Sequence, residues 1–231
     1  MAYFGKLYKR GLDVVRRSRL LTYWIFGVRV HDKVIRFNWD VTTLVLKKAI
    51  DLHVQDGGRD VLEMGCGHLA LLAQYAKRSK PHNRVVGVDI YEEFARNAAE
   101  NTRLNDVPVA ISHSDLYAGV TDRFDYVFFN PPYVPTRNVT IDYPLTTFSG
   151  PDGTDTIRRF LADSHAHLKP GGRILLGVNC FHVPEQRVAD ISRESGYVVE
   201  SIVRRRLNTA RVFVLGKNTQ KGKENSHGDA V

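Results

Sequence analysis

Hydrophobic and polar positions along the middle of the chain follow two alternating patterns. Short apolar runs rich in β-branched and aromatic residues predict buried strands, and the segments between them carry apolar positions every three or four residues, which predicts amphipathic helices. The predicted strands lie at 60–64, 84–89, 108–113, 125–130, 172–178, 196–203 and 210–215. The predicted helices lie at about 68–79, 91–103, 153–168 and 184–194. Strands that alternate with helices predict an α/β fold with a seven-stranded, mostly parallel sheet and helices on both faces.

The end of the chain departs from this alternation. The strands at 196–203 and 210–215 follow each other around Leu207-Asn208 with no helix between them. We therefore expect the final strand to run antiparallel, at or near an edge of the sheet. Residues 217–231 are polar and lack apolar periodicity, which predicts a disordered tail.

The start of the chain has a third pattern. Apolar residues at helical spacing alternate with lysines and arginines over 3–19, which predicts a basic amphipathic helix. Thr22–Val30 and Lys33–Phe37 resemble two short strands of a β-hairpin that turns at His31-Asp32. A further helix is expected from Val41 to His53, with Asp40 as its N-cap.

These patterns divide the chain into three parts. Gly57-Gly58 interrupts the chain before the alternating region begins. We expect residues 1–56, with the basic helix, the hairpin and the second helix, to pack on a main domain at 57–216, which is followed by the tail at 217–231. At 231 residues the chain fits one such domain with a short extension.

Composition and charge indicate which kinds of partner and which cellular compartment to expect. A net charge of +8 and a pI near 9.5 favour an acidic partner such as nucleic acid, a polyanionic protein face or a membrane surface. The two cysteines cannot build a disulfide framework, and the sequence contains no zinc ligand set. The longest apolar stretch near the start, Leu20–Val30, is short and broken by Arg29, and no small-residue cleavage site follows it. We therefore expect a cytoplasmic protein without a transmembrane segment or a metal.

Glycines and carboxylates follow the first strands of the main domain. Gly65-Cys66-Gly67 comes directly after the strand at 60–64, where a glycine turn lets backbone amides approach a ligand closely. Asp89 ends the next strand, about 20 residues further on, where an acidic residue can bind ribose hydroxyls. Asp115 follows the third strand and can accept a hydrogen bond from an adenine amino group. Together these residues predict a nucleoside-containing cofactor at the carboxyl ends of the strands.

Two residues argue against a nicotinamide dinucleotide. Leu69 stands where the dinucleotide fingerprint has its third glycine. Glu63 precedes the turn, where its carboxylate would repel a pyrophosphate but can serve the cationic ammonium and sulfonium groups of S-adenosylmethionine.

The fourth strand opens into Asn130-Pro131-Pro132-Tyr133. The two prolines fix the backbone and remove two amide donors, so nearby carbonyls remain free to accept hydrogen bonds. The amide oxygen of Asn130 and the carbonyl of Pro131 can both accept protons from an NH₂ group, and Tyr133 offers a face on which a planar amide or base can stack. This motif is therefore a candidate acceptor clamp that orients a planar nitrogen for methyl transfer.

Residues 57–216 resemble a Rossmann-like class I S-adenosylmethionine-dependent methyltransferase of the Asn-Pro-Pro-Tyr group. That group includes HemK-type release-factor glutamine methyltransferases, small-domain ribosomal-RNA guanine N2-methyltransferases and adenine N6-methyltransferases. The resemblance implies S-adenosylmethionine as the cofactor and a catalytic set of Asn130, Pro131 and Tyr133. It also implies a cofactor site of Glu63, Gly65, Cys66, Gly67, Asp89, Ile90, Asp115, Leu116 and Asn130.

Other segments refine this resemblance. Phe148 to Gly153, with the later Arg158-Arg159 and Leu168 to Gly172, is similar to the segment that follows the clamp in HemK-type enzymes. Asp40 to Leu44 is similar to the Asp-x-x-Thr entry that roofs the cofactor site in small-domain enzymes. The chain departs from the family at Leu69 and in an N-terminal region shorter than the helical domain of bacterial release-factor enzymes.

Three functions are compatible with these patterns. The leading interpretation is an N-methyltransferase that acts on a Gln or Asn side-chain amide, or a similar planar nitrogen, of a protein or small molecule. The alternative is methylation of an exocyclic nitrogen of an RNA or DNA base, which the arginines at 16–19 and 204–206 favour. A non-catalytic scaffold would be expected to lack the clamp or Asp89, and both are present.

Overall fold

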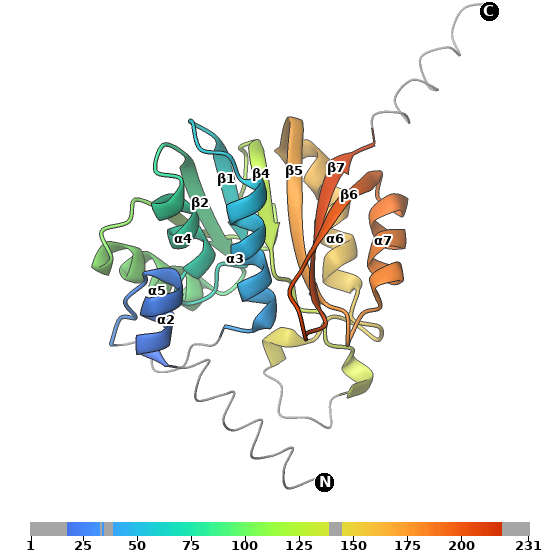
Figure 1. Ribbon diagram of the computed structural model, residues 1–231, viewed down its shortest axis with the longest axis horizontal. Helices are drawn as coiled ribbons and strands as arrows, with labels where there is room; N and C mark the ends of the chain where they lie inside the picture. Colours follow the sequence, from blue (N-terminus) through green and yellow to red (C-terminus); the bar gives the residue numbers. More distant parts are fainter. Residues whose placement is uncertain (1–17, 33, 35–38, 139–144, 219–231) are drawn as a thin grey trace, which may run out of the picture.

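The computed structural model describes residues 18–32, 34, 39–138 and 145–218. A seven-stranded sheet crosses the protein in the order β3-β2-β1-β4-β5-β7-β6 (Figure 1). The strands are β1 Asp60–Met64, β2 Arg84–Asp89, β3 Ala110–His113, β4 Phe124–Phe129, β5 Leu168–Asn179, β6 Tyr197–Arg204 and β7 Ala210–Lys217. The first five strands pair in parallel, and β7 runs antiparallel between β5 and β6. The predicted fold class, with its antiparallel strand near the C-terminus, is confirmed.

Helices cover both faces of this sheet (Figure 1). The described helices are α2 Arg19–Phe26, α3 Val41–His53, α4 Leu71–Ser79, α5 Glu92–Leu104, α6 Asp155–Ser164 and α7 Glu185–Glu194, with short 3₁₀ turns η1 Thr136–Asn138, η2 Leu145–Thr147 and η3 His165–His167. One apolar core joins α2, α3, α4 and α5 to one face of the sheet. A second core joins α6 and α7 to the other face. Alternate residues of the same strands enter the two cores, such as Val61 and Leu62 of β1.

The prediction of a strand over Thr22–Val30 is wrong, because Arg19–Phe26 forms the helix α2. The side chain of Ser18 accepts a hydrogen bond from the Leu21 amide and caps the start of the helix. Gly27 ends it in the left-handed conformation, with its amide bonded to the carbonyl of Tyr23. Aromatic and β-branched residues in this segment imitate a strand, but the two caps select a helix.

The other predictions for the chain ends fall largely on residues outside the described part. The predicted helix at 3–19 lies there apart from its last two residues, and the predicted strand Lys33–Phe37 lies there apart from Val34. Of the predicted tail, Lys217 instead ends β7, and 219–231 lie outside the described residues. Within the described residues no helix is long and apolar enough to cross a membrane.

The helix α3 connects the N-terminal region to the sheet. Asp40 caps it as predicted, and Leu46, Ala49 and Ile50 are fully buried in the core that it shares with β5 and β7. The helix begins beside the carboxyl ends of β1 and β4, at the bottom of Figure 1. This brings Asp40 beside the residues that follow β4. The carboxyl ends of the strands are where open parallel sheets bind ligands.

Candidate active site

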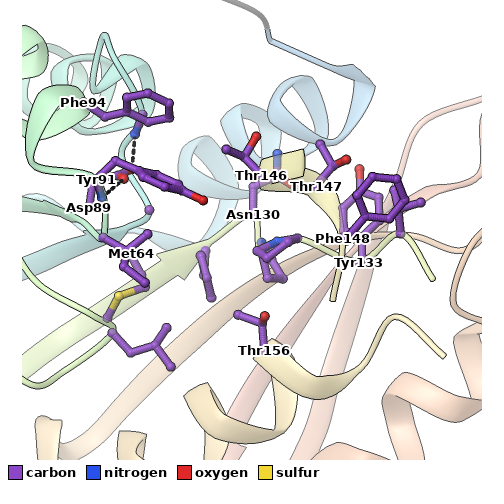
Figure 2. A pocket seen from close by; sticks show the side chains of 18 of the residues that line it. Met64, Asp89, Tyr91, Phe94, Asn130, Tyr133, Thr146, Thr147, Phe148 and Thr156 are labelled. Atoms are coloured by element: carbon purple, nitrogen blue, oxygen red, sulfur yellow. Dashed lines mark hydrogen bonds between the residues drawn. The ribbon is translucent and has the colours of Figure 1, made fainter. Parts of the chain in front are cut away.

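A cavity of about 590 Å³ opens at the carboxyl ends of the parallel strands. Its volume falls within the range of about 300–1,000 Å³ that is typical of small-molecule sites. In Figure 2, Asp89, Tyr91 and Phe94 lie at one end of the cavity, Tyr133 and Phe148 lie at the other, and Asn130 lies between them. Nine residues predicted from the sequence line it, namely Gly65, Gly67, Asp89, Ile90, Asp115, Leu116, Asn130, Pro131 and Tyr133. Glu63 and Cys66 do not belong to the lining.

The glycine turn after β1 needs glycine for both its conformation and its packing. Gly65 has φ +64°, and a Cβ atom there would lie 2.9 Å from the ring of Phe129. Gly67 has φ +62°, and its amide donates a 2.8 Å hydrogen bond to the carboxylate of Asp89. The turn after β1 is therefore tied to the end of β2, and its bare backbone faces the cavity.

Asp89 is a preorganised carboxylate at the end of β2. One oxygen accepts the Gly67 amide, and the other accepts the Tyr91 amide at 2.9 Å. Burial raises the pKa of Asp89 above its usual value, although the two amides and the nearby histidines oppose the shift. The carboxylate oxygens can accept more than one hydrogen bond each, so this group retains capacity for hydroxyl donors in the cavity.

Glu63 lies behind the glycine turn, not in the wall of the cavity. Its carboxylate accepts the Ala73 amide of α4 at 2.7 Å, which satisfies a donor in the first turn of that helix. Burial raises the pKa of Glu63 to about 8, and the charge of Asp89 adds to the increase. Cys66 is also buried, and burial raises the pKa of its thiol well above the usual value, so the residue packs as a small apolar group and not as a nucleophile.

Asp115 lines the cavity from the segment after β3 and forms an ion pair with Arg159 of α6, at 2.8 Å. Both side chains remain substantially exposed, so the pair contributes little to stability. Arg159 is a lining residue that the sequence analysis did not assign to the site, although Arg158-Arg159 belongs to the segment similar to HemK-type enzymes.

The predicted clamp lies where β4 ends. The Asn130 side chain donates to Asp40 over 3.3 Å, and its buried amide oxygen has no hydrogen-bond partner among the described residues. The Tyr133 hydroxyl donates to the other oxygen of Asp40 at 2.7 Å and lies 3.1 Å from the hydroxyl of Thr42. Pro131 lines the cavity between them. A buried carbonyl-type oxygen without a partner is costly, and in a cavity it is suited to a ligand N–H.

Other lining residues were not predicted from the sequence. They include Tyr91, Phe94, Thr146, Thr147, Phe148, Thr156, Asn179 and His182. Asn179 ends β5, and the position at a carboxyl end of a strand is a signal that would have selected it. The His182 ring stacks against Tyr133 with ring centres 5.9 Å apart, and burial lowers the pKa of this histidine, which favours the neutral imidazole at pH 7. The residues around η2 reach the cavity only through tertiary packing.

The residues present fit S-adenosylmethionine better than a metal or a dinucleotide. The fixed carboxylate of Asp89 suits ribose hydroxyls, the open glycine turn suits close approach of a chain, and acidic side chains suit a cation. Within the described ranges, no group of three or more His, Cys, Asp or Glu residues could hold a metal ion. Asn130, whose buried amide oxygen lacks a hydrogen-bond partner among the described residues, lines the cavity between its two ends (Figure 2).

Comparisons with known proteins identify the family of the chain. The model of the methyltransferase small-domain family matches residues 36–201. A putative protein N5-glutamine methyltransferase of Methanocaldococcus jannaschii is 35% identical over 148 residues, which cover 63% of this chain and 72% of that protein. A release factor glutamine methyltransferase of Deinococcus radiodurans is 34% identical over 131 residues, which cover 54% of this chain and only 47% of the relative.

The fold comparison gives the same class. A methyltransferase crystal structure from Pyrococcus furiosus superimposes with a TM-score of 0.66 at 23% identity, and covers 87% of this chain and 93% of that one. At this identity the likeness bears on the fold alone. The family match begins before α3 and includes the glycine turn, Asp89 and the clamp. The chain therefore belongs to the methyltransferase small-domain family and is an S-adenosylmethionine-dependent methyltransferase.

Proposed function

We propose that this enzyme methylates the side-chain amide nitrogen of glutamine in a protein. The observation that carries the proposal is that Asn130 lines the cavity while its buried amide oxygen has no hydrogen-bond partner among the described residues. A glutamine NH₂ group offers two donors in one plane, and the Asn130 oxygen and the Pro131 carbonyl are acceptors placed next to each other in the sequence. The names of the M. jannaschii and D. radiodurans relatives support glutamine as the acceptor.

In this proposal the two ends of the cavity have different ligands. Asp89 holds the ribose of the cofactor, with Ile90 beside it, and Asp115 and Leu116 lie by the adenine. Gly65 and Gly67 border the methionine end, and Cys66 and Glu63 support them from behind. Glu63 acts through its hydrogen bond to α4, which fixes the segment behind the glycine turn, because it does not line the cavity.

The acceptor occupies the end with Tyr133 and Phe148 (Figure 2). The bound cofactor supplies an electrophilic methyl group. Asn130 and the Pro131 carbonyl orient the acceptor nitrogen by accepting its protons, so the lone pair points along the line of transfer. The acceptor nitrogen would take this methyl group from the cofactor and release one amide proton to solvent. The ring of Tyr133 provides an apolar wall for the planar amide.

We further propose that residues 57–216 hold the catalytic groups and that the region before them, with α3, closes the cavity through Asp40. A reducing, cytoplasmic setting is part of this proposal, supported by the two free cysteines. The acceptor is a macromolecule in this account, and a protein is favoured over RNA because both named relatives act on protein glutamine.

The test is methyl transfer from S-adenosylmethionine that carries a trideuterated methyl group. The purified enzyme is incubated with the release factor of the same organism and, separately, with its ribosomal RNA. Peptide and nucleoside mass spectrometry then locate the label. The proposal predicts a label on a glutamine side chain that survives mild acid and base, as expected of an N-methyl amide. A label on adenine N6 or guanine N2, with unlabelled protein, would instead identify a nucleic-acid methyltransferase.

A further inference from the structure

Asp40 is placed to control the acceptor clamp from another part of the chain. It precedes Asn130 by 90 residues and Tyr133 by 93, yet its carboxylate contacts both side chains. One carboxylate oxygen accepts the Asn130 amide nitrogen at 3.3 Å and the Thr43 amide at 2.8 Å. The other accepts the Tyr133 hydroxyl at 2.7 Å. The carboxylate therefore connects the first turn of α3 to the segment that follows β4.

The contact with Asn130 fixes which end of its amide faces the cavity. A carboxylate only accepts hydrogen bonds, so the Asn130 nitrogen must face Asp40. Rotation of the amide by half a turn would place its oxygen against the carboxylate of Asp40, with repulsion in place of a hydrogen bond. The orientation that remains turns the Asn130 oxygen away from Asp40, and that oxygen is buried and lacks a partner among the described residues. A reversed amide would present a donor to the donors of an acceptor NH₂ group.

The contact with Tyr133 fixes the second side chain of the clamp. The hydroxyl donates to Asp40 and also lies 3.1 Å from the Thr42 hydroxyl, so two residues at the start of α3 hold the same phenol. The ring of Tyr133 also stacks against the ring of His182. The Tyr133 ring is buried and held at both its edge and its face. Neither contact requires a bound cofactor.

We propose that Asp40 is a positioning residue for methyl transfer: it sets the orientation of the Asn130 amide and anchors Tyr133. Asp40 acts through these two side chains and does not take a proton from the acceptor. This inference rests on the proposed role of Asn130 as the acceptor of an N–H donor. It gives the region before the main domain a specific part in the reaction, beyond covering the site.

The test must separate this role from helix capping, because Asp40 also caps α3. Asp40→Ser keeps a good N-cap residue, but its hydroxyl is too short to reach both Asn130 and Tyr133. Thr43→Val is the matched control, because it removes the hydroxyl that completes the capping box and leaves the carboxylate in place. Asp40→Asn is the conservative variant, since its amide oxygen can still cap the helix and accept from Asn130.

The main readout is the side-chain NH₂ signal pair of Asn130 in the ¹H–¹⁵N spectrum of the ligand-free protein, assigned by its loss in Asn130→Ala. We expect this pair to shift and broaden in Asp40→Ser and to stay in place in Thr43→Val. With the release factor as acceptor, kcat should fall about tenfold or more in Asp40→Ser, while the Kd for S-adenosylhomocysteine changes less than about threefold. Asp40→Asn should retain more activity than Asp40→Ser.

Two results would overturn the inference. One is an unchanged Asn130 signal pair and an unchanged kcat in Asp40→Ser, which would leave only the capping role. The other is an equal loss of kcat in Thr43→Val, which would assign the effect to helix stability. The spectrum is recorded without an acceptor, so it tests the orientation of Asn130 even if the labelling experiment finds the methyl group on RNA.

Discussion

The buried carboxyl of Glu63 predicts an unusual dependence of stability on pH. Its pKa rises from the ordinary value of 4.5 to about 8 in the folded protein, mainly because burial disfavours the charged form. Between these two values the folded protein binds a proton that the unfolded chain has released. The free energy of unfolding therefore decreases as pH rises through this window. At about 1.4 kcal/mol per pKa unit, the contribution of Glu63 to the free energy of unfolding decreases by about 3 kcal/mol between pH 4 and pH 7.

Glu63→Gln isolates this contribution, because glutamine has the same shape, cannot ionise and can still accept the Ala73 amide. The assay is urea unfolding of both proteins from pH 4 to pH 9. The quantity to compare is the free energy of unfolding of the wild type minus that of Glu63→Gln. This difference should fall steadily from pH 4.5 to 8 and then level off.

Asp60, on the same strand β1, provides a control of the opposite sign. Partial burial raises its pKa, but the ion pairs with Lys169 and Arg84 outweigh burial and hold the pKa below the usual range. The stability that Asp60 contributes is therefore lost as pH falls through its folded pKa. The free energy of unfolding of the wild type minus that of Asp60→Asn should therefore not change with pH from 5.5 to 8. If the Glu63→Gln difference were also flat in that window, Glu63 would be ionised in the folded protein and the reasoning from its burial would be refuted.

Two further predictions concern the cofactor end of the cavity. Asp89→Asn should weaken binding of S-adenosylhomocysteine about 10- to 100-fold in calorimetry. The variant loses a charged acceptor for ribose hydroxyls, and its amide donor faces the backbone amide of Gly67 or Tyr91. Unchanged affinity would place the ribose elsewhere. Gly65→Ala should lower the free energy of unfolding by about 2–3 kcal/mol through its left-handed backbone and the contact with Phe129. Gly67→Ala, where φ is similar but the space around the new Cβ is open, should lower the free energy of unfolding by only about 1 kcal/mol. If urea unfolding showed equal losses for Gly65→Ala and Gly67→Ala, contact with Phe129 would not be the cause.

The sequence predicted the alternation of strands and helices and several residues at the centre of the cavity, because both follow from local patterns. Asp89 and Asn130 each follow directly on a buried strand, and parallel strands bring their carboxyl ends to one edge. The same reasoning could not show that Glu63 lies behind the turn. Its position depends on how α4 begins, after Ala70 adopts a left-handed conformation at φ 44°.

Other features depend on contacts between distant segments. The strand predicted over Thr22–Val30 is a helix, whose Thr22 is buried and accepts a hydrogen bond from the indole of Trp39. The sequence suggested Asp40 as an N-cap, and the structure shows the same carboxylate bonded to two residues of the clamp. Asn130 and Tyr133 lie 90 and 93 residues after Asp40, so no local sequence pattern predicts these contacts, and only the folded structure shows them.

The central claim is that Asn130 holds the acceptor nitrogen, and turnover by Asn130→Ala tests it most directly. The variant and the wild type are compared for kcat on the labelled acceptor and for affinity toward S-adenosylhomocysteine. We expect kcat to fall by about 100-fold or more, as for the loss of one positioned polar group at a reacting centre. Affinity for S-adenosylhomocysteine should change little, because Asp89 and the glycine turn are the proposed partners of the cofactor. Near-normal kcat in Asn130→Ala would mean that Asn130-Pro131-Pro132-Tyr133 is only a structural turn, and would contradict the account.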